Sequence, residues 1–315
     1  RQTLFRPFVK RVVYFDNLLI HRRYQQHRIF PNVECEGENR AIAVSQIGFR
    51  ALTYNALITN CLPDLHLCAT VDGHQCFPFY VYDEDGSNRR ENITDWALQQ
   101  FRAHYGVASR ERKRPESDGA REMLETSGRL RSRLAKGGCD ITKWDIFYYV
   151  YGLLHHPGYR TKFADNLKRE LPRIPLAPDF HAFATAGKNL AQLHLEYEKL
   201  KVYPLKWIET EGVPLSYRVV DKMRLSKDKS SLRINSSLTL VGIPPEVFEY
   251  RLGNRSALEW VVDQYQVSED KRSGIRTDPN RDDDEEYIVR LVGQVVRVSL
   301  ETVKIVNGLP ERFVE

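Results

Sequence analysis

Residues 142–157, with the sequence TKWDIFYYVYGLLHHP, carry the clearest helical pattern in this chain of 315 residues. Thr142 can cap a helix, and Asp145, three residues later, can complete a capping box. Pro157 ends the helix because proline cannot continue its backbone hydrogen bonds. The large apolar side chains share one face at a spacing of 3.6 residues, which predicts a core position for them rather than a base-stacking one: Ile146, Phe147, Val150, Leu153 and Leu154.

On both sides of this helix the pattern changes toward short strands. Upstream, apolar or alternating runs predict strands at 12–15, 41–44, 65–71 and 77–82, with Pro78 at an edge position or a bulge of the last one, and a helix at 92–105. Downstream, two more helices are predicted, one before Pro172 and one from about Asp179. Strands follow at 217–225 and 232–240, then a helix capped by Ser256 and Glu259, a loop over 273–280 and a final helix from Ile288.

This order of elements predicts an α+β fold in three parts. A β-rich N-terminal segment covers residues 1–105, and a charged linker poor in large apolar residues covers 106–138. A helical middle, acting as scaffold, and a mixed α/β C-terminal part occupy 139–315. The chain begins at Arg1 inside a patterned segment, so we expect it to be a piece of a longer polypeptide.

Bulk composition limits the class of protein without defining a function. The chain is 42% hydrophobic and 28% charged, as expected for a globular protein, and it holds no apolar run of membrane-spanning length and no signal-peptide pattern. Its five cysteines are odd in number and form no C-x-x-C pair, which favours a reducing cytoplasm.

The familiar catalytic motifs are missing. No phosphate-binding G-x-x-x-x-G-K-[ST] loop, G-x-G-x-x-G, G-x-S-x-G or H-E-x-x-H occurs, and no Asn/Asp-Pro-Pro-aromatic run of adenine methyltransferases is present. We therefore predict no catalytic residue. Four residues in i, i+2 pairs have zinc-ligand chemistry, but the spacing is unusual and half-buried strands explain it equally well, so we predict no metal: His66, Cys68, His74 and Cys76.

The net charge of +5 is concentrated in two stretches. Residues 1–31 hold seven Lys or Arg residues and one acidic residue, with aromatic residues between the cations. Such clusters can neutralise DNA phosphates, although ion pairing with neighbouring domains explains them nearly as well. The phosphate-binding candidates in this stretch are Arg6, Lys10, Arg11, Arg22, Arg23 and Arg28.

The second basic stretch, 218–233, reads as a strand, a Lys/Asp/Ser loop and a returning strand. A β-ribbon of this kind can enter a DNA groove, whereas the plainer interpretation is an ordinary exposed hairpin. Arginine suits guanine and asparagine suits adenine, and each good bidentate pair contributes about 1–3 kcal/mol of discrimination. The phosphate-binding candidates are Lys222, Lys227 and Lys229, and the base-reading candidates are Arg224, Ser230, Ser231, Arg233 and Asn235.

Two further charged stretches carry less weight. Lys271 and Arg272, beside Gly274, are a weaker DNA-binding candidate. The acidic run 282–286 would repel DNA, and we expect it to face solvent or precede the final helix. A nuclease site built on Asp282, Asp283, Asp284 and Glu285 is a distant alternative, to be tested by metal-dependent cleavage.

Several short motifs, taken in order, cover nearly the whole chain: Arg6-Pro7-Phe8, Arg28-Ile29-Phe30-Pro31, Asp145 to Gly152, Leu171-Pro172-Arg173-Ile174-Pro175-Leu176, Lys222-Met223-Arg224 and Ser273-Gly274-Ile275. Together they resemble the C-terminal specificity, or target-recognition, domain of single-polypeptide type ISP restriction–modification enzymes. No single motif decides this, but their number and order make the set specific. The resemblance does not give base-reading positions, because these change with the target sequence.

The resemblance implies a parent protein with a nuclease, an ATP-driven helicase-like motor and an S-adenosylmethionine-dependent adenine methyltransferase. This chain would be the specificity module: it would bind double-stranded DNA and the methyltransferase and helicase domains of the same polypeptide, position an adenine and license cleavage. The fragment itself would be no enzyme and would hold no cofactor, since S-adenosylmethionine, ATP and Mg belong to the parent. The alternative is a protein-interaction or scaffold domain of a phage-defence complex.

Overall fold

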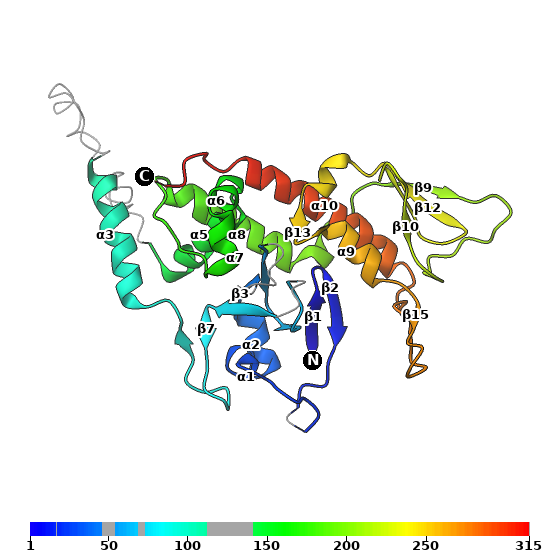
Figure 1. Ribbon diagram of the computed structural model, residues 1–315, viewed down its shortest axis with the longest axis horizontal. Coiled ribbons are helices and arrows are strands. Elements are labelled where there is room, and N and C mark those ends of the chain that lie inside the picture. Colours follow the sequence, from blue (N-terminus) through cyan, green and yellow to red (C-terminus); the bar gives the residue numbers. More distant parts are fainter. Residues whose placement is uncertain (17, 46–53, 69–72, 112–140, 315) are drawn as a thin grey trace, which may run out of the picture.

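The computed structural model describes residues 1–16, 18–45, 54–68, 73–111 and 141–314. Helices form one end of an elongated body, a four-stranded sheet forms the other, and the N-terminal strands lie along one side between them (Figure 1). The long helix α10 (Tyr287–Asn307) runs between the two ends. This arrangement confirms the α+β fold class. In the described part, no helix is both long and apolar enough to cross a bilayer.

The helical end is built on the predicted helix, α5 (Lys143–His155), which packs along α8 (Phe180–Leu195). The capping box is confirmed: the Asp145 amide donates to Thr142 Oγ1 (3.2 Å), and the Thr142 amide donates to Asp145 Oδ2 (2.9 Å). Shorter helices α6 (Pro157–Lys162) and α7 (Ala164–Arg169) follow α5. Helix α3 (Asp95–Glu111) extends the predicted 92–105 helix into the predicted linker, whose residues from 112 on lie outside the described ones.

Two glycines let α5 and α8 approach at backbone distance. A Cβ atom on Gly187 would lie 1.8 Å from the carbonyl oxygen of Tyr148, and one on Gly152 would lie 2.4 Å from that of Phe183. Both contacts are far closer than van der Waals distance, so the two positions require residues without a side chain. The two helices contribute to a large aromatic core, in which Phe79 stacks on Trp144 with ring centroids 3.6 Å apart.

The N-terminal segment contains three small sheets. The first has the order β2-β1-β5, built from β1 (Gln2–Arg6), β2 (Val9–Val12) and β5 (Leu62–Pro63), and Phe8 with φ 59° closes the β1–β2 turn. The second places β3 (Ala41–Ser45) between β4 (Ala56–Thr59) and β6 (His74–Pro78), so Pro78 does lie on an edge strand. The third pairs β7 (Tyr80–Val81) with β8 (Arg90–Glu91). Two short helices, α1 (Gln26–Ile29) and α2 (Val33–Glu38), precede β3.

Three of the four predicted N-terminal strands need correction. The 12–15 strand is wrong beyond Val13, because β2 ends at Val12 and the last backbone hydrogen bonds of this hairpin join Val13 to Arg1 (2.8 and 2.9 Å). Residues 65–68 form a turn in which the Asp64 carboxylate accepts the His66 amide (3.0 Å), and 69–71 lie outside the described residues. The 77–82 strand is divided into β6 and β7 at Phe79, whose buried ring leaves the sheet for the aromatic core.

The C-terminal part holds a four-stranded antiparallel sheet of order β10-β11-β12-β9. Its strands are β9 (Lys206–Glu209), β10 (Arg224–Leu225), β11 (Ser231–Arg233) and β12 (Leu238–Val241). The hairpin β13 (Arg251–Leu252)–β14 (Arg255–Ser256) leads into α9 (Ala257–Gln264), and the hairpin β15 (Ser268–Glu269)–β16 (Arg276–Thr277) precedes α10. Single 3-10 turns lie at Tyr197–Lys199 and Pro245–Phe248. The capping box of Ser256 and Glu259 at the start of α9 is confirmed.

Three predicted C-terminal elements also change. The 217–225 strand shrinks to β10, because the backbone of Val219 bonds to the Asn280 side chain (2.8 and 2.7 Å) instead of to a strand. The 232–240 strand is two strands, β11 and β12, joined by a turn around Asn235. The predicted loop 273–280 contains β16.

Both ends of the chain contribute to one core. Leu4, Phe8 and Val9 of the first hairpin are buried in the same cluster as the apolar residues of α9 and α10. Phe8 contacts the rings of Tyr197 and Tyr250 edge to face, at centroid distances of 5.2 and 6.2 Å. The N-terminal hairpin is therefore an integral part of the C-terminal core, and the division at 106–138 stays a prediction.

Candidate nucleic-acid interface

The four-stranded sheet has an inner face with buried leucines and an outer face that is mostly polar. Because side chains alternate along a strand, Leu225, Leu232 and Leu240 share the inner face, where Leu232 and Leu240 are buried in the C-terminal core. The residues between them point the other way and form the outer face. Its described residues include Lys206, Ile208, Arg224, Ser231, Arg233, Thr239 and Val241, with no acidic residue among them.

Arg224 and Arg233 stand directly opposite each other on this outer face. The register pairs Arg224 with Arg233 and then Arg233 with Thr239 on the next strand. Both arginines are exposed, and neither forms a salt bridge with the residues that the structure describes. Like charges at opposed positions cost roughly 0.2–1 kcal/mol, so the pair is a local source of repulsion that a bound anion would relieve.

The turn between β10 and β11 is held by an aspartate. Asp228 accepts the Ser226 hydroxyl (2.6 Å) and the Ser230 hydroxyl (2.8 Å), and these hydrogen bonds lower the pKa of its carboxyl group. Lys229 adopts φ 60°, and its ammonium group lies 2.8 Å from Glu259. Burial alone would raise the pKa of Glu259, but hydrogen bonds from Lys229 and Ser256 outweigh it and lower the pKa. Lys227, at the tip of the turn, is exposed.

The side chain of Asn235 stabilises the fold through hydrogen bonds to neighbouring turns. Its amide nitrogen donates to the carbonyl oxygens of Ser216 and Arg218 (both 2.8 Å). Its amide oxygen accepts the backbone amides of Ser237 and Leu238 and the Ser237 hydroxyl, at 2.8, 3.0 and 2.9 Å. Base reading by Asn235 stays a prediction, but these five hydrogen bonds argue against it. Ser230 donates to Asp228 and Ser231 is half-buried, so both are weaker base readers than the two arginines.

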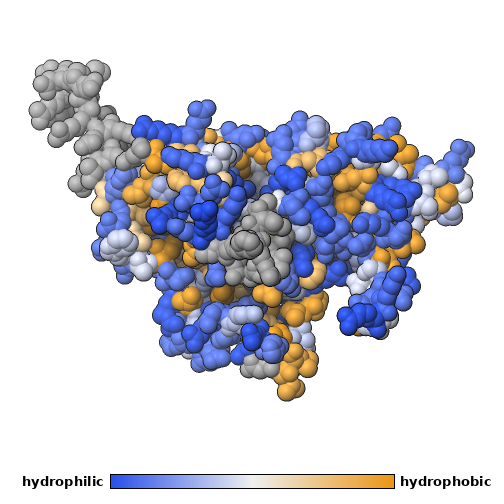
Figure 2. Space-filling view, in the orientation of Figure 1, coloured by the Kyte–Doolittle hydropathy of each residue, from blue (hydrophilic) through white to orange (hydrophobic). Residues whose placement is uncertain are grey.

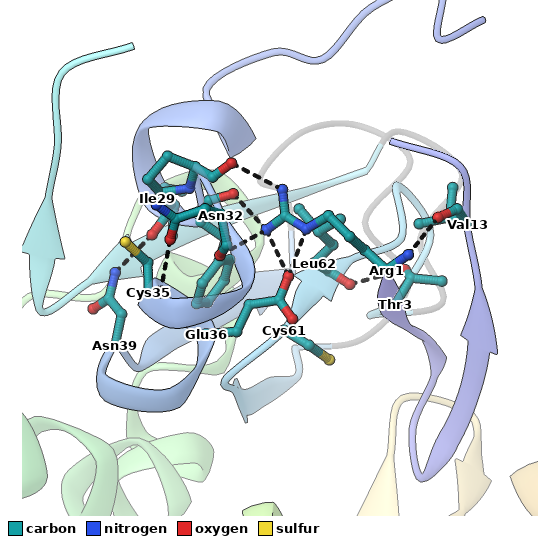
Figure 3. Close-up of polar contacts among 12 residues, drawn as sticks. Arg1, Thr3, Val13, Ile29, Asn32, Cys35, Glu36, Asn39, Cys61 and Leu62 are labelled. Atoms are coloured by element: carbon teal, nitrogen blue, oxygen red, sulfur yellow. Dashed lines mark hydrogen bonds and ion pairs between the residues drawn. The ribbon is translucent and has the colours of Figure 1, made fainter. Parts of the chain in front are cut away.

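Most cations of the 1–31 segment are already paired within the chain. Arg6 lies 2.7 Å from Asp64, Lys10 lies 2.5 Å from Glu198 and Arg23 lies 3.1 Å from Glu84. Figure 3 shows the strongest case: the Arg1 guanidinium binds Glu36 and the carbonyl oxygens of Phe30, Pro31 and Asn32. High positive charge in the sequence therefore overstates the charge available to a ligand. In the described part, Arg22 and Arg28 are the exposed cations of this segment without a salt bridge.

The two basic stretches approach each other at the C-terminal end of α9. From the first stretch, Arg11 donates to the carbonyl oxygen of Gln264 (3.4 Å), and β2 packs against α9. From the second, Lys222 lies 3.8 Å from the Asp263 carboxylate. Cations are favoured there because the last carbonyl groups of a helix carry partial negative charge. Figure 1 shows β2 on one side of α9 and the sheet on the other.

The remaining charged stretches lie near this region. The β15–β16 hairpin, which carries the exposed Lys271 and Arg272, projects from the molecule below the sheet (Figure 1). In the acidic run, Asp282 pairs with Arg218 (3.0 Å) and Asp284 pairs with Arg290, so two of its carboxylates balance nearby arginines. Among the described residues, no three His, Cys, Asp or Glu side chains lie close enough together to hold a metal ion.

Several buried histidine and cysteine side chains belong to the core. The Tyr151 hydroxyl bonds to His194 (2.7 Å), which bonds through its other nitrogen to Thr302 (2.9 Å), and burial lowers the pKa of His194 to about 3. His156 accepts the Tyr159 amide and caps α6, as expected for a histidine at a helix end. Burial raises the pKa of Cys76 to about 12, and Cys35, Cys61, Cys68 and Cys76 are free thiols.

Sequence reasoning missed some basic residues beside the sheet. Lys206 was not considered because β9 itself was not predicted. Arg251 and Arg255 flank Gly253 and Asn254, and a two-residue Gly-Asn turn is a recognised hairpin signal that could have revealed their proximity.

Comparisons with known proteins agree on one family. Residues 1–291 match the family model of the Type ISP C-terminal specificity domain. Among solved structures, a nuclease-deletion mutant of the Type ISP restriction-modification enzyme LlaGI with a DNA substrate mimic matches with a TM-score of 0.75 and 29% identity, over 100% of this chain and 25% of that one. The DNA-bound, ATP-dependent Type ISP enzyme LlaBIII matches with a TM-score of 0.79 and 29% identity, over 100% of this chain and 18% of that one.

A third solved structure, the DrdV–DNA complex, matches with a TM-score of 0.77 and 35% identity, over 98% of this chain and 28% of that one. No curated protein matches the chain. The chain thus corresponds to between 18% and 28% of the length of these three proteins, in which the matching domain is one part of a single polypeptide.

Proposed function

Because this chain belongs to the family of Type ISP C-terminal specificity domains, we propose that it recognises a specific double-stranded DNA sequence within a restriction–modification enzyme. In this proposal it positions a target adenine for methylation and licenses ATP-dependent cleavage, and other domains perform both reactions. The description of the family as specificity domains, together with three similar structures determined with DNA, supports the recognition step.

The observation that carries the proposal is the opposed pair Arg224 and Arg233 on the outer face of the sheet. An exposed pair of like charges gives the folded chain nothing by itself, but each guanidinium can donate two parallel hydrogen bonds to a guanine edge. The small polar residues beside the pair, Ser231 and Thr239, leave room for a groove wall to approach. Base contacts specify the sequence, whereas phosphate contacts fix the position of the protein on the duplex.

Phosphate contacts would come first from cations without a carboxylate partner in the described part of the chain. Arg22, Arg28 and Lys227 meet this condition, and Arg11 bonds only to a backbone carbonyl. The paired candidates would have to exchange their carboxylates for phosphates: Arg6, Lys10, Arg23, Lys222 and Lys229. We therefore propose the first group as phosphate contacts in preference to the second.

The proposed module takes no catalytic role. Its family describes a specificity domain, and the parent's S-adenosylmethionine, ATP and Mg would bind in the other domains. A cytoplasmic location also stays a prediction. In a recognition module of this kind, the target base would leave the helix stack and enter the methyltransferase pocket elsewhere in the polypeptide.

One observation favours the second candidate, a protein-interaction function. Val12, Leu18 and Leu19 are 86%, 88% and 69% exposed. Figure 2 shows apolar side chains gathered at the lower end of the molecule, where Figure 1 places the segment that follows β2. Exposed apolar groups of this kind mark contact surfaces for other proteins or domains. Such contact is compatible with base reading by the outer face of the four-stranded sheet, which lies in another part of the molecule (Figure 1).

The decisive experiment measures sequence preference. Mapping methylated motifs in the DNA of the source strain identifies the target, and the full-length protein is then titrated with target and scrambled duplexes. We expect Arg224→Ala and Arg233→Ala each to lose about 1–3 kcal/mol of discrimination, roughly five- to 150-fold, while affinity for the scrambled duplex changes much less. Lys304→Ala, on the exposed side of α10, is the matched control. Unchanged discrimination in both arginine variants would remove the sheet from the interface.

A further inference from the structure

A basic hollow of about 330 Å³ lies beside the sheet, between the β10–β11 turn, the β13–β14 hairpin and α9. Its charged lining consists of four cations and two carboxylates: Lys222, Lys229, Arg251, Arg255, Glu259 and Asp263. The apolar residues Leu225 and Val262 complete the wall. With both carboxylates ionised, the lining carries two positive charges in excess.

The ion pairs in the hollow are exposed enough to be exchanged. Asp263 lies 2.5 Å from Arg255 and 3.8 Å from Lys222, whose side chains are 37% and 49% exposed. Lys229 is 44% exposed and pairs with Glu259. Exposed ion pairs contribute about 0–1 kcal/mol, so a stronger anion can replace them at little cost. Arg251 donates to the carbonyl oxygen of Asn254, and it forms no salt bridge with a described residue.

The backbone around the hollow is shaped to bring these cations together. Gly253, with φ 73°, occupies the first position of a two-residue turn, as a type II′ hairpin requires, and Arg251 and Arg255 lie on its two strands. Lys229 adopts φ 60°, which costs a residue with a side chain about 1–2 kcal/mol. The fold tolerates this cost at a residue whose ammonium group lines the hollow.

We propose that the basic hollow binds one phosphate of the DNA backbone, with Arg251 as the first contact because it has no carboxylate partner in the described part, and with Arg255, Lys222 and Lys229 joining it as the phosphate displaces their exposed ion pairs. This inference depends on the proposed function, because the anion is taken from the same duplex. Lys222 and Lys229 flank β10, the edge strand on which Arg224 stands opposite Arg233, so a phosphate in the hollow lies beside the sheet. Arginine donors suit a phosphate because the planar guanidinium matches two of its oxygens.

The test is the salt dependence of binding to a short duplex of arbitrary sequence, measured by fluorescence anisotropy with the full-length protein. Each lost phosphate contact lowers the slope of log affinity against log salt by about 0.9, which corresponds to roughly eightfold weaker binding at about 0.1 M salt. We expect Arg251→Ala to show this change for arbitrary and target duplexes alike. Arg251→Lys keeps the charge and should retain the slope.

Two further variants make the outcome decisive. Lys304→Ala removes an exposed charge from α10 and should leave the slope unchanged. If Arg251→Ala fails to fold, Arg251→Gln keeps the stem of the side chain and gives the same readout. A wild-type slope in the neutral variant, or a loss confined to the target duplex, would overturn the phosphate assignment while leaving sequence recognition intact. Absence of any sequence preference in the wild-type protein would instead overturn the proposed function.

Discussion

The close approach of α5 and α8 gives a prediction whose size can be worked out from the structure. In Gly187→Ala, the added Cβ would lie 1.8 Å from the carbonyl oxygen of Tyr148 and 2.7 Å from the backbone nitrogen of Gly152. Both neighbours are backbone atoms of α5, so no side-chain rotation can relieve the overlap. To reach even a tight contact of about 3.2 Å, the two helices must separate by roughly 1.4 Å at this point.

Such a separation loosens the aromatic core on both sides of the contact. Overpacking typically costs 1–3 kcal/mol, and a clash between two backbones belongs at or above the upper end of that range. We expect Gly187→Ala to lower the free energy of unfolding by at least about 3 kcal/mol. For a chain of this size, that corresponds to a fall in thermal midpoint of roughly 4–5 °C.

The assay is urea unfolding followed by far-ultraviolet circular dichroism, with Gly106→Ala as the matched control. Gly106 lies in α3, and a Cβ there would meet no heavy atom within 4 Å. The control should gain up to about 1 kcal/mol, because alanine is the better helix former. If both variants unfold within roughly 0.5 kcal/mol of the wild type, the two helices do not touch at Gly187 and the reasoning is wrong.

Three further predictions concern single side chains. Because burial lowers the pKa of His194 to about 3, the unfolded chain binds a proton at His194 below pH 6.5 that the folded chain does not bind. The stabilising contribution of neutral His194 is therefore complete above pH 6.5, and the free energy of unfolding should fall by up to about 1.4 kcal/mol per pH unit as the pH drops toward 3. Urea titrations at several pH values should show this dependence, and His194→Gln should weaken it. Thr142→Ala should cost about 1 kcal/mol in the same assay and Thr142→Ser almost nothing, since serine also caps. Asn235→Ala should lower the unfolding free energy by about 2 kcal/mol, because it leaves buried backbone groups unpaired; a variant of wild-type stability with altered DNA preference would restore Asn235 as a base reader.

The sequence predicts the helices well because their signals are local. A capping threonine, a proline and apolar residues on one face lie within sixteen positions at α5, and all of them determine its ends directly. The capping box at Ser256 works in the same way. Such features do not depend on distant residues, so the sequence alone is enough to predict the ends of these helices.

Strands were harder because distant side chains decide where backbone pairing stops. At 217–223 the alternating pattern is real, yet Asn280, some sixty positions away in the chain, takes the backbone bonds of Val219. At 65–68 the chain forms a turn, because the His66 amide donates a hydrogen bond to the Asp64 carboxylate instead of to a neighbouring strand. An alternating sequence pattern indicates which side chains share an apolar face, but it does not identify the groups to which the backbone is hydrogen-bonded.

At the candidate interface, too, the sequence shows local features but not the contacts between distant residues. Clusters of cations are visible in the sequence, but their partners are not: Lys10 pairs with Glu198 and Lys229 with Glu259 across long chain separations. The opposed pair Arg224 and Arg233 was within the predicted set, although its register came only from the fold. Arg251 and Arg255 lie on the β13–β14 hairpin, whose Gly-Asn turn is visible in the sequence but whose place beside the sheet is not.

The strict alternation of the four-stranded sheet has a consequence for how such a module can change over time. Leu225, Leu232 and Leu240 pack on the inner side of the sheet, so an exposed residue on the outer face, such as Arg233, contributes little to the core. We expect substitutions of such an exposed residue to change the stability of the chain little. Such a surface can change its preference for a DNA sequence one residue at a time, because substitutions there avoid the packing costs of substitutions in the core.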